Sequence, residues 1–516
     1  MKIKQYLHVL TLSFILVLMS LGCQKDSFLE QQNSQQLSTQ TLFKKPDDGV
    51  MLVNGIYDTF HNRDFLIKAL WYQANFLTQD FKNWGSDTFF ATYEVPTNFG
   101  ALEVFWERSY AGIARANSAV PIIAKMKADG IITDALANRL TGEALFLRGV
   151  FYYYLASNFG GVPLELELTT DNGRHPRKTQ DEVFTQVAID MAEAAKLLPW
   201  KEQLPSSEIG RASKAAAYAY LGDAQMWVKK YAEAAATYEL IKGHSSLETK
   251  YLDIHSFTNQ NGKESLFELQ YIAQADMRNT NNDTHWLTTF CMPEEISRTG
   301  YAYVDKKLYD SFEAGDTRKA ATVIGPGDQH PDPLIKISQY INVINTYGGM
   351  NTLGTSTAPW KGSDGLRSGY YGVKTWRDPN VTGNRPTSST NSNVYYDSGQ
   401  NIPIMRYGQV LLSKAEALAR SGQPQLARDI INNEIRKRAG LGPVPAGADL
   451  NQVIIDEYRH ELNGEFSLWF LLRRNGDHIK FVQQKYGISI PPGKDLMPIP
   501  QKHIAVNPEL IQNPGY

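Results

Sequence analysis

The chain has 516 residues, enough for one large domain or several small ones, and 52 basic residues nearly balance 54 acidic ones. No basic stripe of the kind that marks nucleic-acid binding is present, so nucleic acid is not an expected partner. Only two cysteines occur, Cys23 and Cys291. We predict that Cys291 is a small core residue and that core burial, without an internal disulfide, stabilises the fold.

The first 23 residues have the pattern of a bacterial lipoprotein signal. A short basic head precedes a mostly apolar run, residues 6–21, which is too short and wrongly flanked to be a stable membrane-spanning helix. Gly22 before Cys23 resembles a lipobox, although Ser20 stands where leucine is usual. We expect residues 1–22 to be removed and Cys23 to carry a lipid anchor. A plain secretory signal with an incidental cysteine is the alternative.

Helical periodicity follows a polar stretch. Residues 23–45 carry the lipid and then many Gln, Ser and Thr residues, which predict a flexible tether. Helices are predicted at residues 47–60, 101–128 and 134–157, with Pro121 as a kink or break in the second. The last two form a predicted helical hairpin.

Two later segments have the spacing of a tetratricopeptide repeat. Small residues stand twelve positions apart, Gly222 with Ala234 and Ala415 with Ala427, so two antiparallel helices can approach closely. Bulky residues fill the gaps between them: Tyr218, Leu221, Tyr238, Leu411 and Ile431. Such hairpins stack because none buries its own apolar face, and we expect the earlier hairpin to extend the stack. A chance match is the alternative.

The middle of the chain has a different composition. It is rich in Gly, Asn, Thr, Ser and aromatic residues, with little helical period, and residues 264–270 alternate like a short strand. Loops this long within a compact domain usually serve a function. The predicted fold is therefore mainly α: one domain over residues 46–516, with tetratricopeptide-like helices near 46–242 and 403–440, a loop-rich, aromatic-rich binding region with a few short strands near 243–402, and a C-terminal region, 441–516.

Motifs along nearly the whole chain point to one family. They are Asp26-Ser27-Phe28-Leu29-Glu30, residues 142–164 ending in Phe159-Gly160-Gly161-Val162-Pro163-Leu164, Arg406-Tyr407 through Lys414-Ala415-Glu416-Ala417, residues 432–440, residues 457–474, and the ending from Leu496-Met497-Pro498 to Asn513-Pro514-Gly515-Tyr516. As a set they resemble the SusD/RagB family of outer-membrane nutrient-binding lipoproteins. Leu468 and Leu471 depart from the family pattern, which usually has Arg and Asp there, so interactions of those residues cannot be assumed here.

The resemblance implies a lipid-anchored binder on the exterior of the outer membrane of a diderm bacterium. Such proteins lie over a TonB-dependent barrel transporter, capture oligosaccharides, or in some branches peptides or other nutrients, and pass them inward without catalysis. The implied fold is a set of tetratricopeptide-like helices carrying a loop-rich second half. We therefore expect no enzymatic activity and no cofactor.

Catalytic motifs are incomplete. His460-Glu461 would begin a zincin motif, but Gly464 occupies the position of the second histidine. Glu457, Glu461 and Glu465 stand at helical i, i+4 spacing, which would permit a carboxylate pair for glycoside hydrolysis. We favour a structural salt-bridge network with Arg459, Arg473 and Arg474. No metal site is indicated.

Three windows combine flat aromatic rings with polar side chains: residues 80–93, 279–303 and 347–371. Sugars have an apolar C–H face and a polar rim, so this mixture favours glycan binding. The candidate contacts are Trp286 first, because polar residues precede it in a segment without helical period, then Trp84, Trp360, Asn282, Asp283, Tyr93 and Tyr370. Each Trp can equally be a loop-packing residue. We assign structural roles to Trp376, on a predicted strand, and to Trp106 and Trp469, on helices.

The favoured function is therefore capture of a glycan at the cell surface and its delivery to a TonB-dependent barrel. Three alternatives stay open: binding of peptide or another nutrient, a tetratricopeptide scaffold that binds only proteins, and a surface hydrolase. Exposed loop Trp residues flanked by Asn and Asp favour the glycan. A deep acidic or apolar groove would favour peptide, and a cleft with paired carboxylates would favour hydrolysis.

Overall fold

The computed structural model describes residues 43–169, 171, 173–271, 285–376 and 399–516. The predicted signal, Cys23 and residues 24–42 of the predicted tether lie outside the described residues, as do Asn282 and Asp283. Among the helices in the described ranges, none is both long and apolar enough to span a bilayer.

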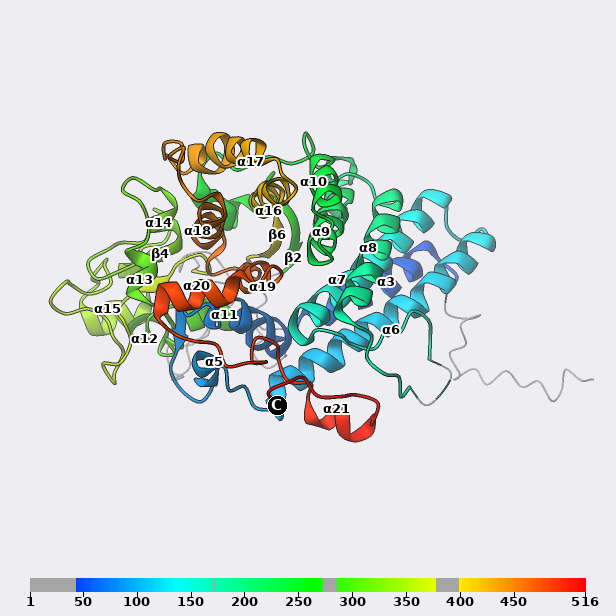
Figure 1. Cartoon of the computed structure of the whole chain (residues 1–516), viewed down its shortest axis with the longest axis horizontal. Helices are drawn as coiled ribbons and strands as arrows, with labels where there is room; N and C mark the ends of the chain where they lie inside the picture. The colour runs from blue at the N-terminus through cyan, green and yellow to red at the C-terminus, as the bar shows by residue number, and fades with distance from the viewer. Residues whose placement is uncertain (1–42, 170, 172, 272–284, 377–398) are drawn as a thin grey trace, which may run out of the picture.

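Helices α3 and α6 to α10, in the first half of the chain, form a packed series to the right in Figure 1. Successive helices from α6 to α10 lie against one another, and α3 packs on α6 and α7. The bounds are α3 (Pro46–Tyr57), α4 (Tyr72–Phe76), α5 (Phe89–Thr92), α6 (Gly100–Ala128), α7 (Asp134–Phe159), α8 (Gln180–Leu197), α9 (Lys214–Trp227) and α10 (Tyr231–Glu239), with a π-helix at Asp64–Trp71. The three predicted helices are confirmed as α3, α6 and α7, and α6 continues through Pro121 without a break.

Both predicted repeats form helical hairpins. The first consists of α9 and α10, and the second of α16 (Tyr407–Arg420) and α17 (Pro424–Ile430), joined by a turn at Gly422 with φ +82°. Helices α10 and α16 pack together, so the two hairpins are neighbours (Figure 1). Ala234, Ala415 and Ala427 are fully buried. A Cβ on Gly222 would collide with the ring of Tyr238, which confirms the close approach of α9 and α10.

Replacing Gly222 by leucine should therefore lower the free energy of unfolding by roughly 1–3 kcal/mol or more, because the larger side chain overpacks the space between the two helices. A chemical denaturation curve of each variant measures the effect. The matched control is Gly55→Leu in α3, because a Cβ at Gly55 has no atom within 4 Å. A loop glycine such as Gly354 would be a poor control, since its φ of +68° and the carbonyl of Ala358 both oppose a side chain. Equal losses at Gly222 and Gly55 would contradict the tetratricopeptide packing.

A loop-rich lobe with its own small core lies to the left in Figure 1. Its helices are short: α11 (His285–Cys291), α12 (Glu294–Ser297), α13 (Lys306–Tyr309), α14 (Arg318–Thr322) and α15 (Ile341–Tyr347). The described residues form three antiparallel strand pairs: β1 (Phe81–Asn83) with β3 (Ala302–Val304), β2 (Ser265–Leu269) with β6 (Ile402–Arg406), and β4 (Val323–Ile324) with β5 (Tyr371–Gly372). The predicted strand at residues 264–270 is confirmed as β2. The predicted fold class, mainly α with a few short strands, is confirmed as well.

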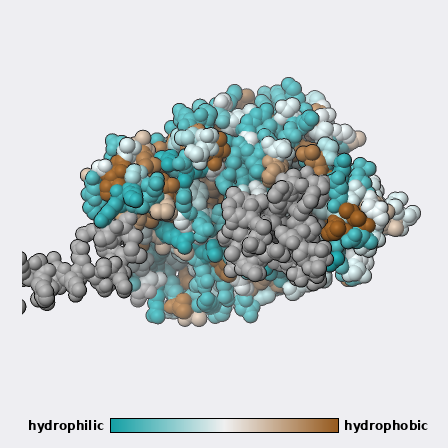
Figure 2. Space-filling view, turned by 180° about the vertical axis from the view of Figure 1, so that it is seen from behind, coloured by the Kyte–Doolittle hydropathy of each residue, from teal (hydrophilic) through white to brown (hydrophobic). Residues whose placement is uncertain are grey.

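The C-terminal region joins the two halves through α18 (Leu450–Leu462), α19 (Leu468–Arg473), α20 (Asp477–Tyr486) and α21 (Gln501–Val506). Helix α18 packs on α16 and α14, and α19 packs on α4. Cys291 is buried in the main core, as predicted. Viewed from behind, the described surface is mostly hydrophilic, and apolar side chains gather in a few separate patches (Figure 2).

The predicted salt-bridge network of Glu457, Glu461 and Glu465 exists, but its cations are not the predicted ones. The ion pairs join Glu457 to Arg318 and Arg436 at 2.7 and 2.9 Å, Glu461 to Arg406 at 2.7 Å and to Arg438, and Glu465 to Arg406 and Lys374 at 2.7 and 2.6 Å. Burial alone would raise the pKa of Glu465, yet Arg406 and Lys374 hold it well below its ordinary value. These carboxylates are buried and already paired with cations, so they do not form a hydrolytic pair.

Helix geometry explains why the predicted arginines do not pair with these glutamates. Arg459 is two residues from both Glu457 and Glu461, hence about 200° around the helix axis, and it instead pairs with Asp80 at 2.6 Å. Arg474 pairs with Glu416 and Asp223, and Arg473 lies 3.8 Å from Asp495. Helix α18 ends at Leu462, so Glu465 does not continue the helical spacing that the sequence suggested.

Candidate functional site

The three aromatic windows of the sequence meet in the loop-rich lobe. Pairing of β1 with β3 joins the first window to the second, and the amide of Trp84 donates to the carbonyl of Tyr301 at 3.2 Å. The third window joins through the amide of Val304, which donates to the carbonyl of Tyr370 at 2.8 Å. Segments that lie far apart in the sequence thus form one surface.

Trp84 is an exposed aromatic residue of this surface, as is Tyr347 of the third window, which is 36% exposed. Trp84 directly follows β1, and 37% of its surface is accessible. Its indole Nε1 donates to the carbonyl of Gly300 at 2.8 Å, and the guanidinium of Arg367 lies 4.4 Å from the ring centroid. The indole is therefore held by its edge and covered on one face by a cation, and we infer that the exposed area belongs to the other face.

Polar groups lie next to this ring. Asn83 Nδ2 donates to the hydroxyl of Tyr301 at 3.3 Å. Burial, together with the nearby carboxylate of Asp87, raises the pKa of Tyr301, so its hydroxyl stays protonated. Asp364 pairs with Arg367 at 2.9 Å and keeps a third of its side chain exposed. An aromatic face with a carboxylate and a hydroxyl nearby can stack on a sugar and hydrogen-bond its hydroxyl groups.

Two predicted contacts prove to be core residues. Trp360 is 5% exposed and packs in the second core, with its ring 5.1 Å from that of Tyr347. Tyr93 is 1% exposed and donates its hydroxyl to the carbonyl of Leu77 at 2.7 Å. Neither offers a ring face to a ligand. Tyr370 is half-buried, with its ring 4.8 Å from that of Tyr309.

The first-ranked candidate, Trp286, lies in the short helix α11 rather than in a segment without helical structure. Seven residues make too short a helix to show a clear period in the sequence. The side chain of Trp286 is not described, and Asn282 and Asp283 lie outside the described residues, so all three stay predicted contacts. Trp106, Trp376 and Trp469 are buried, as predicted for structural residues, but Trp376 lies beside a turn and not in a strand.

Family comparisons agree with this architecture. A model described as "SusD family" matches residues 254–516, about half of the chain. This chain belongs to the SusD family. A second model, "Starch-binding associating with outer membrane", matches residues 27–224. The sequence resemblance to the SusD/RagB family is thereby confirmed.

The individual relatives have low sequence identity to this chain, but the similarity extends over most of each protein. The chain is 24% identical to SusD-like protein P2 of Formosa agariphila, over 98% of the chain and 99% of that protein. It is 25% identical to starch-binding protein SusD of Bacteroides thetaiotaomicron, over 75% of the chain and 74% of that protein. Surface glycan-binding protein A of Bacteroides thetaiotaomicron, solved with laminarihexaose, is 22% identical and has the same fold, with a TM-score of 0.72 over 90% of this chain and 99% of that one.

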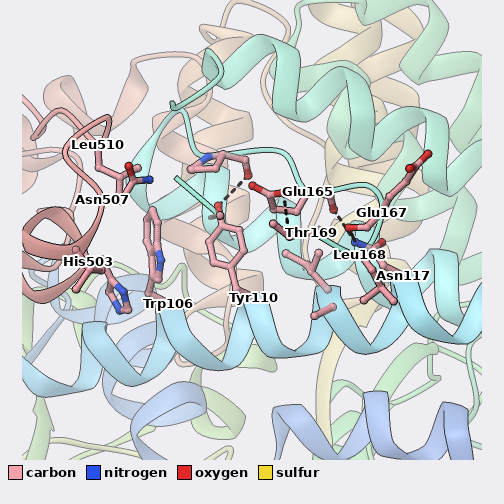
Figure 3. A pocket seen from close by; sticks show the side chains of 15 residues that line it. Trp106, Tyr110, Asn117, Glu165, Glu167, Leu168, Thr169, His503, Asn507 and Leu510 are labelled. Atoms are coloured by element: carbon pink, nitrogen blue, oxygen red, sulfur yellow. Dashed lines mark hydrogen bonds between the residues drawn. The ribbon is translucent and has the colours of Figure 1, made fainter. Parts of the chain in front are cut away.

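This SusD-family chain also has a hollow of about 320 Å³ between α6, the loop at residues 163–169 with Gly173, and the C-terminal segment with α21. Figure 3 shows Trp106 and Tyr110 side by side on α6, with His503 next to Trp106. Trp106 is 5% exposed and stacks on His503, with ring centroids 5.7 Å apart. Tyr110 donates to the carbonyl of Pro163 at 2.8 Å, and Asn117 donates to the carbonyls of Glu165 and Glu167 at 2.9 and 3.1 Å. These polar groups fasten the loop, so we assign this hollow a structural role.

No group of three or more metal-ligating side chains stands ready for a cation in the described ranges. His460 lies 3.1 Å from the hydroxyl of Ser311, and its ring stacks on Phe312 at 4.5 Å. Beside it, Glu461 is engaged by the arginine cluster. The two residues therefore have structural partners where a zincin motif would have placed a metal.

Sequence reasoning missed Arg367. The residue lies in the third window, in Lys361-Gly362-Ser363-Asp364-Gly365-Leu366-Arg367, but an arginine among loop residues carries no distinctive signal. Two glycines flanking an aspartate were the available sign of a tight loop, because glycine readily adopts positive φ. Gly362 and Gly365 indeed have φ of +74° and +71°.

Proposed function

We propose that this protein captures a glycan on the Trp84 face of its loop-rich lobe and delivers it to a TonB-dependent transporter in the outer membrane. The observation that carries the proposal is the exposed indole of Trp84, which is fixed at its Nε1 edge and backed by Arg367, itself paired with the partly exposed carboxylate of Asp364. The names of the relatives support the ligand class, since one is a starch-binding protein and another was solved with laminarihexaose.

We propose that the protein acts on the exterior of the outer membrane and binds its ligand without catalysis. The motif at Cys23 supports a lipid anchor that holds the protein on the exterior of the outer membrane. The acidic residues that would have to form a hydrolytic pair, Glu457 and Glu461, are buried among arginines. Incubation with bound oligosaccharides should therefore release no product. Peptide binding is the competing outcome, and a panel that includes peptides distinguishes it.

Replacing Trp84 by alanine should weaken glycan binding about ten- to a hundred-fold. Loss of one stacking platform costs roughly 1–3 kcal/mol, by analogy with base–aromatic stacking. Titration calorimetry against starch oligosaccharides, laminarihexaose and other glycans measures the change. The melting temperature should stay nearly constant, because Trp84 is partly exposed and belongs to neither hydrophobic core.

The matched control is Trp360→Ala in the same lobe. Trp360 is buried, so its loss should lower the free energy of unfolding by about 3–5 kcal/mol through the cavity left behind. Unchanged affinity in Trp84→Ala would move the binding site elsewhere, with Trp286 as the next candidate. A large loss of stability in Trp84→Ala would make Trp84 a packing residue.

A further inference from the structure

Arg367 lies where four segments of the loop-rich lobe meet. Its side chain is fully buried, and its Nε donates to the carbonyl of Gly300 at 2.9 Å, just before β3. Ion pairs of 2.7 and 2.9 Å join it to Glu294 on α12 and to Asp364 in its own loop. Its guanidinium covers one face of Trp84, after β1. One side chain thus connects all the segments around the proposed platform.

A single carbonyl holds both the ring and the cation. Gly300 accepts from Trp84 Nε1 at 2.8 Å and from Arg367 Nε at 2.9 Å, which uses both lone pairs of the oxygen. With its edge hydrogen-bonded and one face against the guanidinium, the indole has little freedom to change rotamer. A lysine could supply the charge but not the planar fork that reaches Gly300 and the carboxylates together.

The loop of Arg367 is shaped around the guanidinium. Gly362 has φ +74°, and a Cβ there would collide with Arg367 Nη1. The amide of Gly362 donates to Glu295 at 2.8 Å, and the hydroxyl of Ser363 donates to Glu294 at 2.7 Å. The same carboxylate of Glu294 therefore holds both the loop and the arginine that the loop encloses.

We propose that Arg367 is a positioning residue for ligand binding. It holds Trp84 in the orientation that receives a sugar on one face of the indole, and its guanidinium keeps the ligand from the other face. This inference rests on the proposed function of Trp84. Its physical basis is preorganisation: a ring that is already ordered loses little conformational entropy when a ligand stacks on it. A merely structural Arg367 would affect stability without affecting Trp84 or affinity selectively.

The test compares Arg367→Met, Arg367→Lys and Trp84→Ala in the full protein, purified in mild detergent. Fluorotryptophan labelling and fluorine NMR report on the Trp84 ring, whose signal is identified by its absence in Trp84→Phe. Titration calorimetry measures the affinity for laminarihexaose and for starch oligosaccharides. We expect Arg367→Met to move the Trp84 signal toward that of a free indole and to weaken binding at least ten-fold. In Arg367→Lys, both the position of the Trp84 signal and the affinity should lie between those of the wild type and those of Arg367→Met. If Arg367→Met does not fold, Glu294→Gln, which removes one ion pair and leaves the guanidinium in place, should give the same changes in smaller degree.

Two results would overturn the inference. An unmoved Trp84 signal in Arg367→Met would show that the arginine does not order the ring. An unchanged affinity in Arg367→Met, with weakened binding in Trp84→Ala, would show that binding does not need the ordering. If the wild type and Trp84→Ala bind glycans equally well, Trp84 is not part of the binding site. In that case Arg367 does not act in binding through Trp84.

Discussion

Replacing Arg406 by methionine is expected to lower the free energy of unfolding by about 3–5 kcal/mol, because it removes a buried cation that three buried carboxylates share. Arg406 is 1% exposed and pairs with Glu264 at 2.8 Å and with Glu461 and Glu465 at 2.7 Å each. Methionine fills similar space but cannot compensate three carboxylates. Chemical denaturation at neutral pH measures the loss.

The control is Lys125→Met, which breaks an exposed ion pair to Asp129, with 63% and 43% of the two side chains accessible. Exposed pairs contribute little, so this variant should lose about 1 kcal/mol or less. Similar losses in the two variants would contradict the view that burial makes the Arg406 cluster critical.

The cluster also predicts a pH dependence. Burial alone would raise the pKa of Glu465, but Arg406 and Lys374 hold it well below the ordinary 4.5, so its stabilisation is complete above pH 4.5 and is lost as the pH falls further. Burial lowers the pKa of the neighbouring His255 from 6.5 to about 4, so that residue begins to destabilise the fold below pH 6.5. Unfolding free energy should therefore fall in acid, and below pH 4.5 the decline should be shallower in Arg406→Met than in the wild type.

Replacing Cys23 by alanine is expected to abolish lipid attachment and to release the protein from the outer membrane. The proposed lipid would attach through the cysteine sulfur, and among the described residues no helix can span a bilayer in its place. Fractionation of cells that express each form, followed by immunoblotting of membrane and supernatant, measures the shift. A Cys291→Ala variant is the control, because Cys291 is a buried core residue and its loss should leave the anchoring intact.

Residual membrane association of Cys23→Ala would have to come from the proposed transporter. Isolation of the wild type in mild detergent should then recover a very large β-barrel protein, and deletion of that barrel should release Cys23→Ala completely. If Cys23→Ala stays on the membrane in cells without the barrel, the anchor assignment is wrong. If the wild type is recovered alone from cells grown on the inducing glycan, a free-standing binder replaces the proposed pair.

The helical scaffold could be predicted because it depends on short-range spacing. A helix repeats every 3.6 residues, so apolar periodicity predicted α3, α6 and α7, and the twelve-residue spacing of Gly222 and Ala234 predicted a close hairpin. Family membership could also be predicted, because its motifs extend over nearly the whole chain and do not depend on any single contact.

Tertiary structure alone decided which charges pair and which rings are exposed. Glu461 and Arg459 are close in sequence but lie on different sides of α18, so Arg459 pairs with Asp80, nearly four hundred positions away. Trp84 and Trp360 both stand in windows that combine aromatic and polar residues, yet the first is 37% exposed and the second 5%. Burial depends on what the rest of the chain brings to a residue, and that information is absent from its neighbours in the sequence. By composition and spacing, the sequence determined the scaffold, the family and the three windows, whereas long-range packing selected Trp84 and placed Arg367 beneath it.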